Sequence, residues 1–96
     1  MDLVVTYDVK TGDKAGERRL RRVATTCKSF GQRVQFSVFE VHVDELQLER
    51  LRQRLLAIID VKEDSLRIYR LHGPREDAVE AYGLDKYVDM QGPLVL

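Results

Sequence analysis

Apolar side chains occupy both faces of the first extended segment of this chain. The run from Leu3 to Val9 is rich in β-branched and aromatic residues, which favour strands. Because side chains alternate along a strand, the odd-numbered residues of this run share one face, and Val4 and Thr6 share the other face with Asp8. A strand with apolar atoms on both faces needs cover on both sides of its sheet.

Two helical patterns supply one of the two covering layers. Asp13 is placed to cap a helix over roughly 14–29, in which apolar residues recur at helical spacing. Phe30-Gly31 ends this helix, and we expect Gly31 to adopt the left-handed conformation that is common at helix ends. A second helix begins at the capping-box-like start Asp44-Glu45-Leu46-Gln47 and runs to about Asp60. The residues expected to face the core are Leu20, Val23, Ala24 and Cys27 of the first helix, and Leu48, Leu51, Leu55 and Ile58 or Ile59 of the second.

The remaining segments predict strands. The run over 32–43 is longer than an average strand, so it is either one bent strand or two strands joined near Phe36-Ser37. Residues 61–64 form a polar turn, and residues 65–71 alternate as a strand. The order strand, helix, one or two strands, helix, strand is that of a ferredoxin-like βαββαβ sandwich of the α+β class, with both helices on one face of the sheet.

A chain of 96 residues makes one small domain, so we expect no second layer for the other face of the sheet. Residues 1–96 are therefore expected to form a single domain that pairs with a second copy about a two-fold axis. The apolar tail, residues 92–96, is placed to pair as an extra C-terminal strand with the sheet edge of the partner. Disorder of this tail is the alternative.

Asp8 is the candidate for chemistry. It is a lone carboxylate at the end of a strand, just before Lys10-Thr11-Gly12-Asp13, where a metal or a substrate can reach it. One carboxylate is too few to hold a divalent metal on a protein surface. If Asp8 lies near the two-fold axis, two copies of it can share one Mg²⁺ or Mn²⁺, with water and a substrate phosphate completing the shell of oxygens. The alternative is an acid that caps a helix or forms a turn.

Basic residues gather in the first half of the chain, although the net charge is zero. Residues 1–43 hold eight Lys or Arg against five acids, and the end of the chain is acidic. Eleven of the sixteen cations are Arg, whose planar fork suits bidentate contacts with phosphate. On the first helix, Arg18 and Arg22 point away from the apolar stripe, while Arg19 and Arg21 lie on opposite flanks. The pattern favours a phosphate-bearing partner, with solvated helix faces as the alternative.

The composition is that of a soluble globular chain, with 44% hydrophobic and 33% charged residues. The start, Met1-Asp2-Leu3-Val4-Val5, lacks the basic and long apolar regions of a secretory signal. No stretch approaches the roughly 20 apolar residues that span a bilayer, so no membrane partner is expected. Cys27 is the only cysteine, which excludes an internal disulfide and fits the reducing cytoplasm.

Several segments resemble the small CRISPR-associated protein two family. They are the strand over Val4–Val9 that ends in Tyr-Asp-Val, the basic helix after it, and the segments Gln32–Glu40 and Asp64–Leu71. The pattern Gln-Arg-Val-Gln-x-Ser-Val-Phe-Glu in the second of these strands is far more specific than a lone Tyr-Asp pair. The ending Gly92–Leu96 is also similar to the tail of the family, so the resemblance covers about the whole chain.

This resemblance implies a ferredoxin-like homodimer whose terminal strand crosses onto the partner's sheet, with Mg²⁺ or Mn²⁺ at Asp8. It also implies a metal-dependent endonuclease that acts on single-stranded RNA or on double-stranded DNA. Members of the family form the central dimer of the CRISPR adaptation complex as well, where they bridge two integrase dimers and hold captured DNA across a basic surface. The alternative function is therefore a non-catalytic architectural adaptor in spacer acquisition.

The resemblance also implies roles for single residues. Asp8 matches the metal ligand and catalytic carboxylate, Tyr7 matches the aromatic residue before it, and Ser37 and Phe39 match a segment near the metal. Core packing is the alternative role for Tyr7 and Phe39. Neither histidine, His42 or His72, stands where it would activate Ser37, which excludes a serine hydrolase. Arg19 and Arg21 match basic residues of the first helix that lie near nucleic acid, and Arg33 matches a basic residue at the start of the second strand. Together with the outward-pointing residues of the first helix, the residues expected to bind nucleic acid are Arg18, Arg19, Arg21, Arg22 and Arg33.

Overall fold

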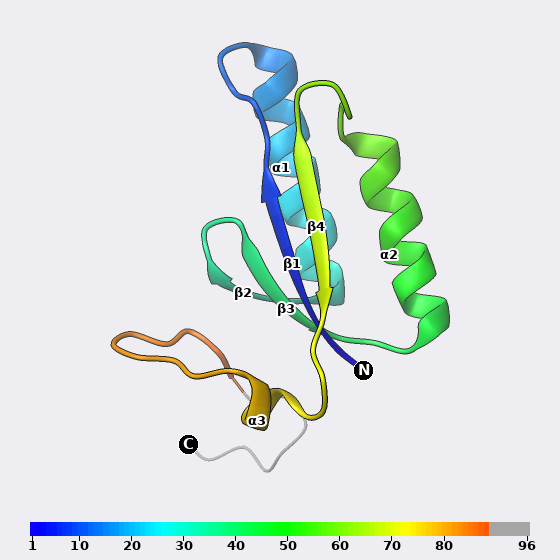
Figure 1. The fold of residues 1–96 in the computed structure, drawn as a ribbon. Helices are drawn as coiled ribbons and strands as arrows, with labels where there is room; N and C mark the ends of the chain where they lie inside the picture. The colour runs from blue at the N-terminus through cyan, green and yellow to red at the C-terminus, as the bar shows by residue number, and fades with distance from the viewer. Residues whose placement is uncertain (89–96) are drawn as a thin grey trace.

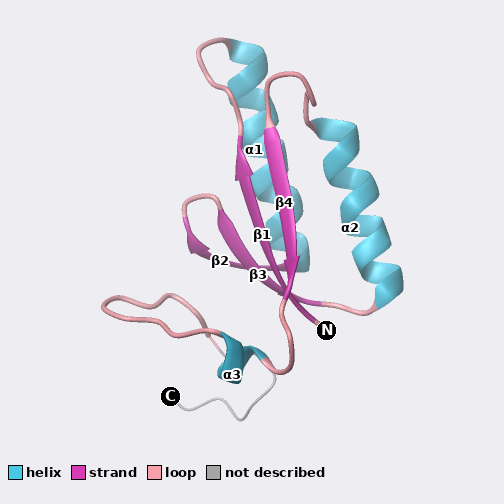
Figure 2. Cartoon of the chain, viewed as in Figure 1, coloured by secondary structure: helices cyan, strands magenta, loops and turns pink. Residues whose placement is uncertain are grey.

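A four-stranded antiparallel sheet carries helices α1 and α2 on one of its faces in the computed structural model, which describes residues 1–88 (Figure 1). The strands lie in the order β2-β3-β1-β4, so the first strand is central and is flanked by β3 and β4. The predicted order of helices and strands is confirmed (Figure 2). The elements are β1 (Asp2–Asp8), α1 (Lys14–Phe30), β2 (Gly31–Gln35), β3 (Val38–His42), α2 (Glu45–Ile58), β4 (Ser65–Arg70) and the short α3 (Arg75–Ala78).

Both long helices begin where the sequence predicts. The carboxylate of Asp13 accepts a hydrogen bond from the Gly16 amide at 2.7 Å, which satisfies one of the free amides of the first turn of α1. At the start of α2, Asp44 and Gln47 form a reciprocal capping box, each side chain accepting from the other residue's backbone amide. The predicted capping at both helix starts is confirmed.

The expectation of a left-handed Gly31 is wrong. Its backbone is extended, with φ −162° and ψ −155°, and the residue already pairs with Val41 as the first residue of β2. A Cβ atom at this position would lie 2.4 Å from the carbonyl oxygen of Glu40. Glycine is needed here because β2 leaves α1 directly against the backbone of β3, not because the chain needs a positive φ.

The long extended run is two strands, one of the two arrangements that the sequence left open. β2 and β3 form a hairpin that turns at Phe36 and Ser37, with a register shift between Arg33 and Gln35. The irregularity is a bulge-like break at the end of an edge strand. The turn leaves Phe36 93% exposed.

The core lies between the sheet and the two long helices. Leu3, Val5 and Tyr7 of β1 point into it, which confirms the alternation predicted for this strand. The predicted apolar stripes of both helices also face it, with Leu20 and Ile58 at its margin. Within residues 1–88, no helix is both long enough and apolar enough to cross a membrane. The buried hydrophobic residues are Leu3, Val5, Tyr7, Val9, Val23, Ala24, Cys27, Phe39, Val41, Val43, Leu48, Leu51 and Leu55.

The expectation that no part of the chain covers the second face of the sheet is wrong for one end of that face. Beyond β4, the guanidinium of Arg75 binds the carboxylate of Glu40, a buried residue on this second face, and lies 3.5 Å from the ring centroid of Tyr87. The side chain of Gln32 bonds to both the amide and the carbonyl of Val88, at 2.7 and 2.6 Å. The segment 75–88 therefore covers the end of the face near the start of β1, and the end near Asp8 stays open. The predicted tail strand, 92–96, lies outside the described residues.

Candidate functional site

Asp8 is the last residue of β1, and its side chain is exposed on the open face of the sheet. It pairs with Ser65, the first residue of β4. On the other side of β1, the amide of Tyr7 donates to the carbonyl of Ser37 at 3.2 Å, which extends the β1–β3 contact into the hairpin turn. Within residues 1–88 the carboxylate of Asp8 has no hydrogen bond or ion pair, so its oxygens are available to a ligand.

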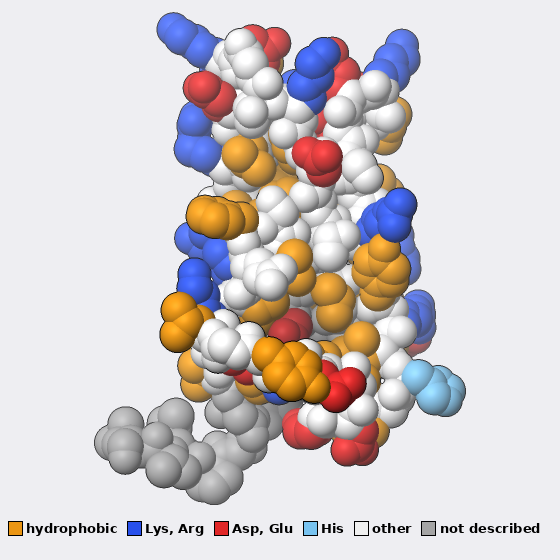
Figure 3. Space-filling view, turned by 60° about the vertical axis from the view of Figure 1, so that its left-hand side comes forward, with side chains coloured by type: hydrophobic (Ala, Val, Ile, Leu, Met, Phe, Trp, Pro, Cys, Tyr) orange, Lys and Arg blue, Asp and Glu red, His pale blue; other side chains and the backbone are white. Residues whose placement is uncertain are grey.

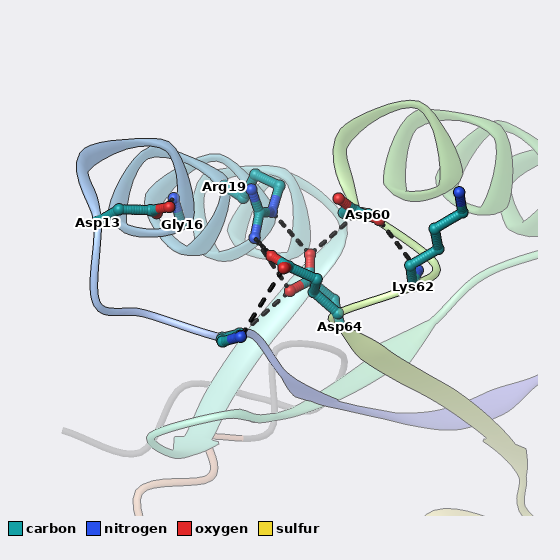
Figure 4. A network of polar contacts seen from close by, with 8 residues as sticks. Asp13, Gly16, Arg19, Asp60, Lys62 and Asp64 are labelled. Carbon is teal, nitrogen blue, oxygen red and sulfur yellow. Dashed lines mark hydrogen bonds and ion pairs between the residues drawn. The ribbon is translucent and has the colours of Figure 1, made fainter.

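A network of polar contacts centred on Asp64 lies directly beside this strand end (Figure 4). One carboxylate oxygen of Asp64 accepts from the amide of Lys10 at 3.0 Å, and the other accepts from the amide of Asp60 at 2.9 Å. Arg19 of α1 adds a fork, with Nε 2.8 Å from one oxygen and a terminal nitrogen 3.4 Å from the other. The side chain of Asp64 is fully buried by these groups, and that of Arg19 is 16% exposed.

The electrostatics of the network favour the charged form of Asp64. Burial raises the pKa of this carboxyl, but the guanidinium of Arg19 and the amides of Asp60 and Lys10 outweigh burial, so the pKa lies below its ordinary value. Beside the network, Glu63 lies 3.5 Å from Arg19 and 3.8 Å from the ammonium of Lys10. Its side chain is 41% exposed, so we assign it a minor part.

The four arginines of α1 have different surroundings. Arg19 is held by Asp64, as described above. Arg18, Arg21 and Arg22 are exposed, and none of them has an acidic partner in the part of the chain that the structure describes. Arg21 and Arg22 also line a groove between α1 and α2, opposite Arg54. These exposed guanidinium groups are available to an anionic partner.

Tyr7, Phe39 and Arg33 form a cluster on the helix side of the sheet, away from the open face. The rings of Tyr7 and Phe39 stack with centroids 6.2 Å apart, and the guanidinium of Arg33 lies 5.2 Å from the centroid of Phe39. Tyr7 and Phe39 are buried, which agrees with the core-packing alternative. Burial raises the pKa of the Tyr7 phenol, and the nearby Arg33 offsets part of that effect. Neither the hydroxyl of Tyr7 nor Nε of Arg33 has a hydrogen-bond partner within the described residues.

The candidate residues thus separate into three groups. Asp8 and Ser37 lie around the end of β1, with Ser37 contributing its backbone carbonyl to Tyr7. The exposed arginines lie on α1, and the aromatic cluster supports β1 from the core side. His42 is peripheral, because its ring pairs with Asp2 at 2.8 Å and its side chain is 52% exposed.

The role of one residue beside Asp8 escaped prediction. The role of Asp64 had no local signal, since its partners Arg19 and Lys10 lie 45 and 54 positions earlier in the chain. Phe36 was seen as a possible turn residue, and the turn itself explains its exposure.

A divalent metal ion needs more ligands than the side chains around Asp8 offer in one chain. No group of three or more His, Cys, Asp or Glu side chains among residues 1–88 is placed to hold a metal ion. Asp8 nevertheless fits a hard cation such as Mg²⁺ as one ligand, because it is an exposed carboxylate without an ion-pair partner in this range. The remaining ligands must come from water, substrate or a second copy.

The fold and the site together define a small α+β domain. Its sheet has one helical layer and a partly open second face, and an exposed carboxylate stands at the end of its central strand. Comparison with protein families gives this class a name: the chain belongs to the family described as CRISPR associated protein Cas2, whose model matches residues 1–79. The family predicted from the sequence is therefore confirmed.

Relatives of known name agree with this membership. The chain is 54% identical, over the full length of both proteins, to the CRISPR-associated endoribonuclease Cas2 1 of Moorella thermoacetica. It is 46% identical, over 99% of each chain, to the CRISPR-associated endonuclease Cas2 of Halalkalibacterium halodurans. Among solved structures, the Streptococcus pyogenes Cas2 crystal structure at pH 6.5 matches with a TM-score of 0.77 and 47% identity, covering 86% of this chain and all of that one. The names of these relatives support a nuclease role in general terms.

Proposed function

We propose that this protein binds nucleic acid in CRISPR spacer acquisition and cleaves phosphodiester bonds, in single-stranded RNA or double-stranded DNA, with a divalent metal at Asp8. The observation that carries the proposal is the position of Asp8: an exposed carboxylate without a partner among residues 1–88, at the end of the central strand of the sheet. Hard oxygen ligands of this kind suit Mg²⁺ or Mn²⁺. The relatives named endoribonuclease and endonuclease support the same class of activity.

The proposed active form is a ferredoxin-like homodimer, because one chain offers the metal a single carboxylate. The end of the face near Asp8 is left open by the segment 75–88, and it presents Val38 opposite Thr6. One row further from Asp8, Val4 and Tyr69 share this face with Glu40, and Tyr69 is 46% exposed. In the view of Figure 3, hydrophobic side chains lie along the middle of the surface, and Lys and Arg side chains lie along its margins. Two copies packed through such a face would bring two Asp8 side chains towards one axis.

The chemistry divides between the metal and the side chains of the chain. When bound, the metal would lower the pKa of a water molecule and neutralise charge on the phosphate under attack. Asp8 would hold the ion, while Arg18, Arg21 and Arg22 on the surface of α1 would bind backbone phosphates of the nucleic acid. Arg33 is a weaker candidate for this contact, because its guanidinium lies against the ring of Phe39.

Replacement of Asp8 with asparagine tests this function. Asp8→Asn should abolish Mg²⁺- or Mn²⁺-dependent cleavage of labelled RNA and DNA and leave the dimer intact by sedimentation, because the exposed side chain makes no hydrogen bond or ion pair within residues 1–88. Asp77→Asn is the matched control, since Asp77 is an exposed acid of α3 without an ion pair in that range. Metal-dependent cleavage that persists in Asp8→Asn would refute the proposal.

The second candidate function is a non-catalytic adaptor that bridges integrase dimers and holds spacer DNA. The exposed arginines of α1 favour it, because they would bind DNA without any metal. Spacer acquisition should then survive Asp8→Asn and fail when Arg18 and Arg22 are replaced by Glu. Removal of residues 92–96 should also stop acquisition, and normal acquisition without this tail would count against the adaptor.

A further inference from the structure

Two contacts fix the end of β1, which bears Asp8, to the start of β4. Asp8 pairs with Ser65 across the sheet, and the residue immediately before Ser65 is Asp64. Two positions after Asp8, the amide of Lys10 donates to the carboxylate of that same Asp64 at 3.0 Å. Beyond Lys10, residues 11–15 are exposed. The last ordered pairing of β1 and the first turn of its loop are therefore both tied to the start of β4.

Asp64 is itself held rigidly. Its two oxygens receive the amides of Lys10 and Asp60 together with the fork of Arg19. A carboxylate that accepts several charge-assisted and backbone hydrogen bonds in a buried place has one favoured orientation. The chain thus connects α1, the loop after α2 and the end of β1 through a single side chain (Figure 4).

We propose that the Arg19–Asp64 pair is a positioning device that holds the strand end bearing Asp8 in the geometry for binding a divalent metal. The inference rests on the function proposed above for Asp8. It gives Arg19 a role different from its exposed neighbours: Arg19 acts through Asp64 and the Lys10 amide and does not contact phosphate. Residues that orient a metal ligand without touching the ion commonly change metal affinity by about 10- to 100-fold when they are replaced.

The first test measures metal binding separately from cleavage. Mn²⁺ binding to the full-length protein, followed by electron paramagnetic resonance, should weaken about tenfold in Asp64→Asn. Cleavage at saturating Mn²⁺ should return to within about threefold of the wild-type rate, because the device places the ligand and takes no part in the chemistry. Glu63→Gln is the matched control: it removes the same charge one position away, from an exposed carboxylate, and should bind Mn²⁺ like the wild type.

A milder variant guards against loss of folding. Arg19→Lys keeps the positive charge but loses the fork that reaches both oxygens of Asp64, so it should weaken Mn²⁺ binding by a smaller factor. Amide hydrogen exchange at Lys10, followed by nuclear magnetic resonance, should become faster in both variants and stay unchanged in Glu63→Gln. This readout reports the strand end directly and does not depend on nuclease activity.

The results distinguish the positioning role of the Arg19–Asp64 pair from the function proposed for Asp8. Unchanged Mn²⁺ affinity in folded Asp64→Asn or Arg19→Lys, together with faster Lys10 exchange, would overturn the positioning role. A lower saturating rate with unchanged Mn²⁺ affinity would overturn it as well. If Asp8→Asn binds Mn²⁺ as tightly as the wild type, the function proposed for Asp8 fails. Only the Asp8 variant tests this function, since the Asp64 and Arg19 variants test the positioning role.

Discussion

Gly31 offers a direct test of how the hairpin is joined to α1. An added Cβ would lie 2.4 Å from the carbonyl oxygen of Glu40 and 2.7 Å from Cγ2 of Val41. Both atoms belong to β3, which is held between β2 and β1. The edge strand β2 must therefore move, by at least about 0.6 Å to bring the closer contact to 3.0 Å. Overpacking of this kind costs about 1–3 kcal/mol.

Two further contributions set the expected change in the free energy of unfolding for Gly31→Ala. Displacement of β2 weakens its hydrogen bonds to β3, each worth about 1 kcal/mol. Replacing glycine also restricts the unfolded chain, which returns roughly 0.4–1 kcal/mol. We therefore expect Gly31→Ala to lower the free energy of unfolding by about 2–3 kcal/mol, and the melting temperature by roughly 10–20 °C for a domain of this size. Urea unfolding followed by circular dichroism, at one fixed protein concentration, measures it.

A second substitution distinguishes close approach from a left-handed backbone. If Gly31 needed a positive φ, asparagine would be tolerated better than alanine. Because the backbone is extended and space is the limit, Gly31→Asn should cost at least as much as Gly31→Ala. Gly83→Ala is the reference for a real positive φ, +78°, with no atom within 4 Å of the added Cβ, and should cost about 1 kcal/mol. The reasoning fails if Gly31→Asn is the milder change or if Gly31→Ala costs under about 0.5 kcal/mol.

Three other predictions follow from burial and charge. Leu51 is fully buried, so Leu51→Ala should lower the free energy of unfolding by about 3 kcal/mol in urea, whereas Leu46→Ala, at a site 62% exposed, should change it by less than about 0.5 kcal/mol. Burial raises the pKa of the Cys27 thiol to about 11, so a thiol reagent at pH 8 should label Cys27 only at the rate of unfolding; fast labelling of the native protein would contradict this. The pKa of Asp64 is lower in the folded protein than in the unfolded chain, so its stabilising effect is complete above the unfolded value, about 3.9, and is lost as the pH falls through the folded value. The difference in unfolding free energy between the wild type and Asp64→Asn should stay constant above about pH 5 and shrink below about pH 4; a difference that is the same at pH 3 would contradict it.

The sequence predicted features whose causes lie within a few residues of one another. Asp13 and Asp44 cap helices through amides three positions later, and the alternation along β1 placed Tyr7 and Asp8 on opposite faces of the sheet. The role of Gly31 was not predictable, because the atom that excludes a side chain belongs to Glu40 on the neighbouring strand. A glycine after a helix has two explanations, and sequence alone favours the commoner one.

The same limit applies to the candidate site. Alternation and turn chemistry placed Asp8 at a strand end, but the partners of Asp64 come from elements far apart in the chain. The segment 75–88 covers one end of the second face because Arg75 binds Glu40 and Gln32 binds the backbone of Val88. No periodic pattern in the sequence predicts either contact. Long-range polar contacts are specified by the finished fold, so they escape analysis of short windows.

Arg19 and Arg22 of α1 should therefore respond differently when the salt dependence of nucleic-acid binding is measured. Arg19 is 16% exposed and bound to Asp64, whereas Arg22 is exposed and has no acidic partner within residues 1–88. A phosphate contact releases counterions, so Arg22→Gln should reduce the salt dependence of nucleic-acid binding by about one unit of slope. Arg19→Lys should leave that slope unchanged and alter the metal requirement instead. A lower slope in the Arg19 variant would show that Arg19 leaves Asp64 to bind phosphate. The assignment of Arg22 to phosphate binding and of Arg19 to positioning would then be wrong.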